Sequence, residues 1–121
     1  MIEQDAEREE RITMEIVVDA YGPQEQAMGW YYYLQDTMQF PFTAVCISKR
    51  RGSLVKEGAT VEVVGMAEED QCEREMFVEI DWDGDTLAVS LIQLEAPEAD
   101  PETQQAISDW HYWVSQGYEF G

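Results

Sequence analysis

The 121-residue chain has the length of one domain, and its hydrophobic content of 45%, with 12% aromatic residues, is enough to build a packed core. Its formal net charge of −19 argues against an ordinary nucleic-acid-binding protein, because binding to phosphate backbones requires lysine and arginine arrayed on one face. Self-repulsion at this charge density works against compaction unless cations neutralise part of it, so cations are the first partner that we expect.

The charge is unevenly distributed along the chain. Residues 66–121 contain fifteen aspartates and glutamates against a single base, Arg74. One basic island lies in the first half of the chain and consists of Lys49, Arg50, Arg51 and Lys56. Four bases among so many acids make a poor footprint for phosphates, so we expect neither nucleic acid nor an anionic membrane as a partner.

The N-terminal residues MIEQDAEREERI contain no apolar segment behind a basic start, and no run of about 18 apolar residues occurs in the chain. We therefore expect a cytoplasmic protein, and a monomer. Cys46 and Cys72 are then expected to be reduced thiols, with Cys46 in the core. Neither has a CxxC partner or a histidine at ligand spacing, which argues against zinc.

A stripe of apolar residues at steps of four, with charged residues between them, predicts a first helix from Ala6 to about Tyr21. The β-branched residues at positions 16 to 18 lose side-chain freedom in a helix. A strand over RITMEIVV, residues 11–18, therefore stays open as the alternative.

Gly22 and Pro23 then separate the first helix from a second, which is predicted over residues 23–38 with one packed face. This helix contains the aromatic tract GWYYYL, residues 29–34. We expect its tryptophan and leucine to pack in the core and its tyrosine hydroxyls to reach polar partners at the rim, rather than a ligand-stacking site.

From residue 42 the pattern changes to strands. TAVCIS is an apolar run, and LVKEGATVEVVG places a tight turn before an alternating strand, as in small SH3-like barrels. Asp83-Gly84 between the alternating runs MFVEIDW and DTLAVSLIQL predicts a two-residue hairpin, because both positions need positive φ. The pairs expected in that register are Trp82 with Asp85, Ile80 with Leu87, and Val78 with Val89.

Asp100-Pro101 is a typical helix start, and the apolar stripe after it predicts a last helix. The expected fold class is α+β, in a single domain. N-terminal helices (about 6–38) would pack on a small SH3-like antiparallel β-barrel (42–95), followed by a C-terminal helix (101–116).

Three groups of acids could converge on a metal ion. The hairpin group is Asp81, Asp83 and Asp85, the loop group is Glu68, Glu69 and Asp70, and the helix group is Glu15, Asp19 and Asp36. Ca²⁺ takes six to eight hard oxygen ligands, and open sites with several carboxylates favour it over Mg²⁺. In the helix group, Glu15 and Asp19 are four residues apart and would share one helix face. The alternative for each group is a solvated acidic surface.

The hairpin group does not form an EF-hand loop. Counted from Asp81, the sixth and twelfth positions hold Thr86 and Ile92 instead of the required glycine and glutamate. Enzyme signatures are also missing from the sequence, because no serine lies in a GxSxG elbow and no phosphate-binding glycine loop occurs. His111, the single histidine, is expected to be a partly exposed helix residue, and we do not expect an enzyme.

The chain closely resembles the cyanobacterial-type family of small acidic calcium-binding proteins, which are not EF-hand proteins. The resemblance runs from about Glu10 to Trp113 and is carried by ERITMEIVVDAYGPQEQAMGWYYYLQDTMQFPFTAVCI, LVKEGATVEVVGMA and FVEIDWDGDTLAVSLIQLE. It implies an acidic cytosolic protein, with helices packed on a small β-barrel, that binds Ca²⁺ at surface sites and buffers or regulates free calcium. Within the matching blocks it points first to Asp36 in LQD and second to Asp19 in VVDAY.

Two other functions stay open. The chain could be an interaction module in which the barrel or the GWYYYL face binds a regulatory protein partner, while the acids only provide solubility. It could also be an acidic mimic of nucleic acid that occupies a basic protein. Partners that persist in chelator would favour the first of these, and salt-sensitive capture of DNA-binding proteins would favour the second.

Overall fold

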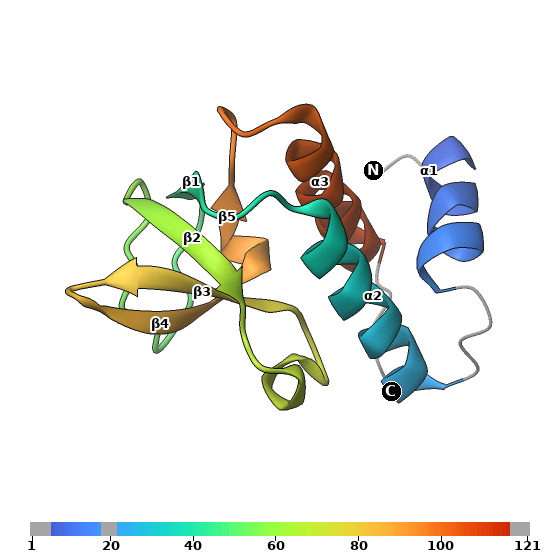
Figure 1. Ribbon diagram of the computed structural model, residues 1–121, viewed down its shortest axis with the longest axis horizontal. Coiled ribbons are helices and arrows are strands. Elements are labelled where there is room, and N and C mark those ends of the chain that lie inside the picture. The colour runs from blue at the N-terminus through green and yellow to red at the C-terminus, as the bar shows by residue number, and fades with distance from the viewer. Residues whose placement is uncertain (1–5, 18–21, 117–121) are drawn as a thin grey trace.

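The computed structural model describes residues 6–17 and 22–116 of the chain. Its elements in chain order are α1 (Ala6–Arg11), the π-helical turn η1 (Ile12–Ile16), α2 (Pro23–Thr37), β1 (Phe42–Cys46), β2 (Thr60–Met66), the 3₁₀ helix η2 (Glu69–Cys72), β3 (Phe77–Trp82), β4 (Asp85–Ser90), the 3₁₀ turn η3 (Leu91–Gln93), β5 (Leu94–Glu95) and α3 (Pro101–Ser115). The helices gather at one end of the molecule and the sheet forms the other, with α1 on the side away from the sheet (Figure 1). The expected α+β class is confirmed.

The first helical segment is confirmed as far as residue 16, and the alternative strand is wrong. Ile12 and Ile16 are both buried, whereas Met14 is 63% exposed, although a strand would place all three on one face. The predicted end near Tyr21 lies outside the described residues. A β-carbon on Gly29 of α2 would lie only 2.3 Å from the Ile16 carbonyl oxygen, so this glycine lets η1 pack directly on α2.

The second and last helices begin where the sequence predicts. Gly22 is the N-cap of α2 and Asp100 that of α3, and a proline follows each of them. The seam between the two helices is aromatic, because the ring centroid of Trp30 lies 5.1 Å from that of Trp110 and 5.6 Å from that of Trp113. These rings lie in the same hydrophobic core as the inner face of the sheet.

The sheet is antiparallel with the order β4-β3-β2-β1-β5. The hairpin of β3 and β4 has the predicted turn, with φ of 55° at Asp83 and 84° at Gly84. All three predicted cross-strand pairs are present: Trp82 with Asp85, Ile80 with Leu87, and Val78 with Val89. Along β3 the side chains of Val78 and Ile80 are fully buried, so the predicted apolar face is the one that packs on the core.

The predicted SH3-like barrel is not confirmed, because the sheet is not closed. The run DTLAVSLIQL is not one continuous strand, as β4 ends at Ser90 and η3 turns the chain toward β5. The turn buries Leu91 completely, and Gln93 donates a hydrogen bond of 3.1 Å from its side-chain nitrogen to the Ser48 carbonyl oxygen. The two-residue strand β5 then pairs with β1 and leaves β4 at the edge of the sheet.

Candidate metal site

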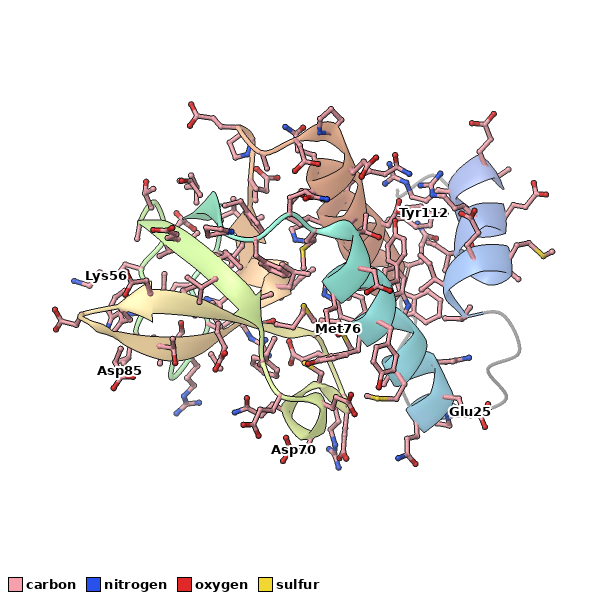
Figure 2. The ribbon with its side chains drawn as sticks, viewed as in Figure 1. Glu25, Lys56, Asp70, Met76, Asp85 and Tyr112 are labelled. Atoms are coloured by element: carbon pink, nitrogen blue, oxygen red, sulfur yellow. The ribbon has the colours of Figure 1, made fainter. Side chains whose placement is uncertain are left out.

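The three predicted acidic groups occupy separate parts of the molecule. Figure 2 shows Asp85 at the hairpin end, far from the helices, and Asp70 on the loop beside the lower part of α2. The described members of the third group, Glu15 and Asp36, lie on η1 and α2. Any ions held by the hairpin group would therefore bind apart from ions held by the other two groups.

The hairpin group is exposed and split between two faces. Asp81 is paired with Thr86 across the hairpin, whereas Asp85 is paired with Trp82. Because neighbouring residues of a strand point to opposite faces, Asp81 and Asp85 lie on opposite sides of the sheet. The Asp85 carboxylate also accepts a 2.9 Å hydrogen bond from the backbone nitrogen of Thr86. The two-residue turn thus works against the convergence that the spacing of these acids predicts.

The loop group is folded into the helix η2 and tied to α2. Glu68 is the N-cap of η2 and forms a capping box with Gln71. Glu69 accepts a 2.7 Å hydrogen bond from the hydroxyl of Tyr32, a residue 37 positions earlier in the chain. Asp70 is exposed in the first turn. The acidic loop is therefore held against the outer surface of α2.

In the helix group, Asp36 is exposed on the last turn of α2 and Glu15 is exposed on η1. Asp19 lies outside the described residues. Tyr32 and Tyr33 precede Asp36 by four and three residues, so they lie on either side of it on the helix surface. We call the surface of Asp36, Tyr32 and Tyr33 the Asp36 face.

The two tyrosines attach this face to acids from distant segments. Tyr32 donates to Glu69 of the loop group, and Tyr33 donates a 3.0 Å hydrogen bond to Asp109 of α3. Glu69 of the loop group is thus attached to the helix that carries Asp36.

The phenols of this face stay protonated at neutral pH. Burial raises the pKa of Tyr33 well above its usual value, and the charge and hydrogen bond of Asp109 raise it further. The hydrogen bond to Glu69 raises the pKa of Tyr32, and the Glu69 charge adds to it. Both hydroxyls therefore act as donors that orient neighbouring carboxylates. The tyrosine hydroxyls reach polar partners as predicted, but only that of Tyr32 does so at the exposed rim, because the Tyr31 bond and the Asp109 partner of Tyr33 are buried.

Asp109 is a polar residue that our reading of the sequence missed. It is fully buried, and it is held by Arg11 at 2.6 Å, by Arg8 at 3.3 Å and by the Tyr33 hydroxyl. It joins α1, α2 and α3 through one carboxylate. Its place in the apolar stripe of α3, three residues after Ala106, was the available signal, because a charged residue in such a stripe must be paired.

Over residues 6–17 and 22–116, the side chains as placed bring no three acids, histidines or cysteines together in a geometry that could hold a metal ion. The assignment of individual ligands therefore stays a prediction. His111 is partly buried, as expected, with its Nε2 atom 3.0 Å from the Leu91 carbonyl oxygen. Both cysteines are free and buried.

A family of proteins described as calcium binding matches residues 10–114 of this sequence. The chain belongs to this calcium-binding family. The matched range contains all nine acids of the three groups, including Asp19. It is not a family of enzymes, and the predicted resemblance is confirmed.

Two solved structures share the fold of this calcium-binding protein. The crystal structure of Anabaena CcbP is 48% identical in sequence, with a TM-score of 0.88, and the match covers 98% of each chain. A calcium-binding protein in its calcium-binding form is 46% identical, with a TM-score of 0.85, and the match covers 97% of this chain and 96% of the other. No curated protein matches the chain. Among the described residues, no helix is both long and apolar enough to cross a membrane.

Proposed function

We propose that this protein binds Ca²⁺ through surface carboxylates around the Asp36 face, and that it thereby buffers or regulates free calcium inside the cell. The family of the chain supports the ion, since the family is described as calcium binding and a similar structure is of a calcium-binding form. The net charge of −19 supports a role for cations in stabilising the fold.

The observation that carries this proposal is the position of Asp36 between two anchored tyrosines. Asp36 is exposed on the last turn of the helix whose Tyr32 holds Glu69, and Tyr33 holds Asp109. Asp36 and Glu69 come from two segments of the chain, so a cation between them would convert their mutual repulsion into attraction. Rotation of these exposed side chains would supply oxygen ligands, together with water.

The exposure of these acids favours a buffer with rapid exchange. Open carboxylate sites are screened by salt, and their ligands can be reached by solvent. Mg²⁺ demands tight octahedral geometry and keeps its own waters, so such a loose arrangement favours Ca²⁺. The hairpin group would contribute at most a separate and weaker site, because its acids point to two faces.

Calorimetric titration with Ca²⁺ at about 0.15 M salt tests the proposal. We expect the variant Asp36→Asn to weaken the tightest site by at least about tenfold, or about 1.4 kcal/mol. Glu57→Gln is the matched control, since it also removes one exposed negative charge but lies in the turn before β2. Equal isotherms for Asp36→Asn and Glu57→Gln would remove Asp36 from the site.

A second titration separates the acidic groups. We expect Asp83→Asn to leave the tightest site unchanged, because the hairpin tip lies at the opposite end of the molecule from the helices. We expect Glu69→Gln to weaken that site, because Glu69 faces α2 through Tyr32. The reverse pattern would move the main site to the hairpin.

A further inference from the structure

The strand β4 has an open edge. It lies at one end of the sheet and pairs with β3 alone among the described strands. The backbone nitrogen of Leu91 donates to the Met76 carbonyl oxygen at 2.9 Å. This bond shows which residues of β4 direct their backbone groups toward β3, because such residues alternate along an antiparallel strand. Counting back from this bond, the backbone groups of Ala88 and Thr86 point away from β3, and both residues are exposed, whereas Ser90 is buried as the N-cap of η3. They form a row of donors and acceptors along the open edge.

Apart from Asp85 at its start and the basic loop beside its end, this edge lacks the usual protection against pairing with another chain. Natural proteins blunt an edge strand with charged residues, proline or a bulge. Residues 86–90 read TLAVS and contain neither a charge nor a proline, in a chain of which 27% is charged. The register between β3 and β4 is also regular from Phe77 to Trp82.

A groove of about 360 Å³ lies beside this edge. We call the loop of residues 49–56 the basic loop. Its residues 50–54 form one wall of the groove, and β4 with the base of the hairpin forms the other. Basic and apolar side chains line the groove, among them Arg50, Arg51, Leu54, Phe77 and Leu87. Leu54 is 62% exposed, so the groove offers apolar surface as well as positive charge.

One arginine of the basic loop, Arg50, fixes the loop in place, and the other, Arg51, is available to bind a ligand. Arg50 donates to both oxygens of Glu75, at 2.6 and 3.0 Å, and Glu75 also accepts a 2.5 Å hydrogen bond from the Ser90 hydroxyl. Burial alone would raise the pKa of Glu75, but these hydrogen bonds and the Arg50 charge lower it, so Glu75 stays ionised. Arg51 is exposed and forms no ion pair with any described residue.

We propose that this edge and groove bind an extended acidic peptide segment of a protein partner, which adds to the sheet as a strand beside β4. Its backbone would pair with the outward groups of Thr86 and Ala88, in the manner of strand addition. Its carboxylates would face Arg51 and the other cations of the basic loop, and its apolar side chains would contact Leu54 and Leu87.

Charge and shape both favour this occupant. The chain as a whole repels acids, but at about 0.15 M salt the screening length is about 8 Å, so the nearby basic loop dominates at the groove. A nucleic-acid strand would satisfy the cations, yet it could not extend the backbone ladder. No residue that lines the groove belongs to the Asp36 face, so the proposal stands apart from calcium binding.

The test uses a fluorescein-labelled eight-residue peptide of alternating valine and glutamate. Its fluorescence anisotropy is measured with the full chain at about 0.15 M salt, with a calcium chelator present. We expect a dissociation constant on the order of 10–100 µM, typical of a small transient interface. A peptide with lysine in place of glutamate should not bind. A glutamate peptide N-methylated at alternate residues should lose binding, and this change cannot affect the folding of the protein.

Protein variants locate the site. Arg51→Glu should weaken binding at least about tenfold, whereas Arg74→Glu, which changes the net charge equally at an exposed position outside the groove, should not. Equal weakening by both variants, retained binding of the N-methylated peptide, or no binding at about 1 mM protein would overturn the proposal. Sedimentation that shows copies of the chain pairing through this edge would assign it to a second copy and would also overturn it.

Discussion

The substitution Asp109→Asn removes the charge that Arg8 and Arg11 face, while it keeps the size of the side chain. Asp109 is fully buried, whereas the side chains of Arg8 and Arg11 are 27% and 28% exposed. Breaking a fully buried ion pair costs about 3–5 kcal/mol. The arginines here can turn partly to water, so we expect a smaller loss, about 2 kcal/mol.

The loss converts to a measurable shift in melting temperature. An unfolding entropy of about 2.1 cal/mol/K per residue gives roughly 0.25 kcal/mol/K for a chain of this length. The melting temperature should therefore fall by about 8 °C in a calorimetric scan at pH 7. Asp81→Asn, at an exposed site on the sheet, is the matched control and should change the free energy of unfolding by less than about 0.5 kcal/mol.

A double-mutant cycle separates the ion pair from other effects. Arg11→Met and Asp109→Asn together should cost less than the sum of the two single changes, with a coupling of about 1 kcal/mol or more. A fall of less than about 2 °C for Asp109→Asn, or additive single effects, would show that this network does not hold α1 against α2 and α3.

Three further substitutions probe the fold. Gly29→Ala should destabilise the protein by about 1–3 kcal/mol in urea unfolding, because its β-carbon would clash with the Ile16 carbonyl oxygen and outweigh the gain in helix propensity. Glu75→Gln should lower the free energy of unfolding by about 1 kcal/mol at pH 7. Because the pKa of Glu75 is lowered in the folded protein, this difference from the parent should persist above about pH 4.5 and vanish as the pH falls through the lowered pKa. A difference that stays constant with pH would contradict the Arg50 contact. Asp100→Ala should cost about 1 kcal/mol by removing the N-cap of α3, and an unchanged thermal midpoint would contradict that role.

Local signals in the sequence predicted most of the fold. The Asp83-Gly84 turn was predictable because both residues adopt the positive φ that its two positions require, and the hairpin register follows from the turn. The starts of α2 and α3 were predictable from a cap residue followed by proline. These signals span only a few residues, so they do not depend on tertiary packing.

The parts that were missed depend on distant contacts. The break of the last strand at Ser90 reflects the burial of Leu91 and a hydrogen bond from Gln93 to the Ser48 carbonyl, 45 residues earlier. No local pattern separates this turn from a continuing strand. After the break, β5 pairs with β1 over two residues, and β4 stays at the other edge of the sheet.

The candidate site was predicted only in part. The sequence pointed to Asp36 and Glu69, but not to the hydrogen bond by which Tyr32, on the same helix as Asp36, holds Glu69. The hairpin group illustrates the opposite error, because acids two residues apart in sequence do not converge when the pleat sends Asp81 and Asp85 to opposite faces. Sequence spacing therefore identified the acidic residues but not their geometry.

The most direct test of the calcium proposal compares thermal unfolding of the purified chain in about 1 mM Ca²⁺ and in chelator, at about 0.15 M salt. A site with a dissociation constant of about 10 µM would add about 2.7 kcal/mol, which raises the melting temperature by about 10 °C. The same concentration of Mg²⁺ should raise it far less. Identical melting temperatures with Ca²⁺ and with chelator would contradict calcium binding by the native state.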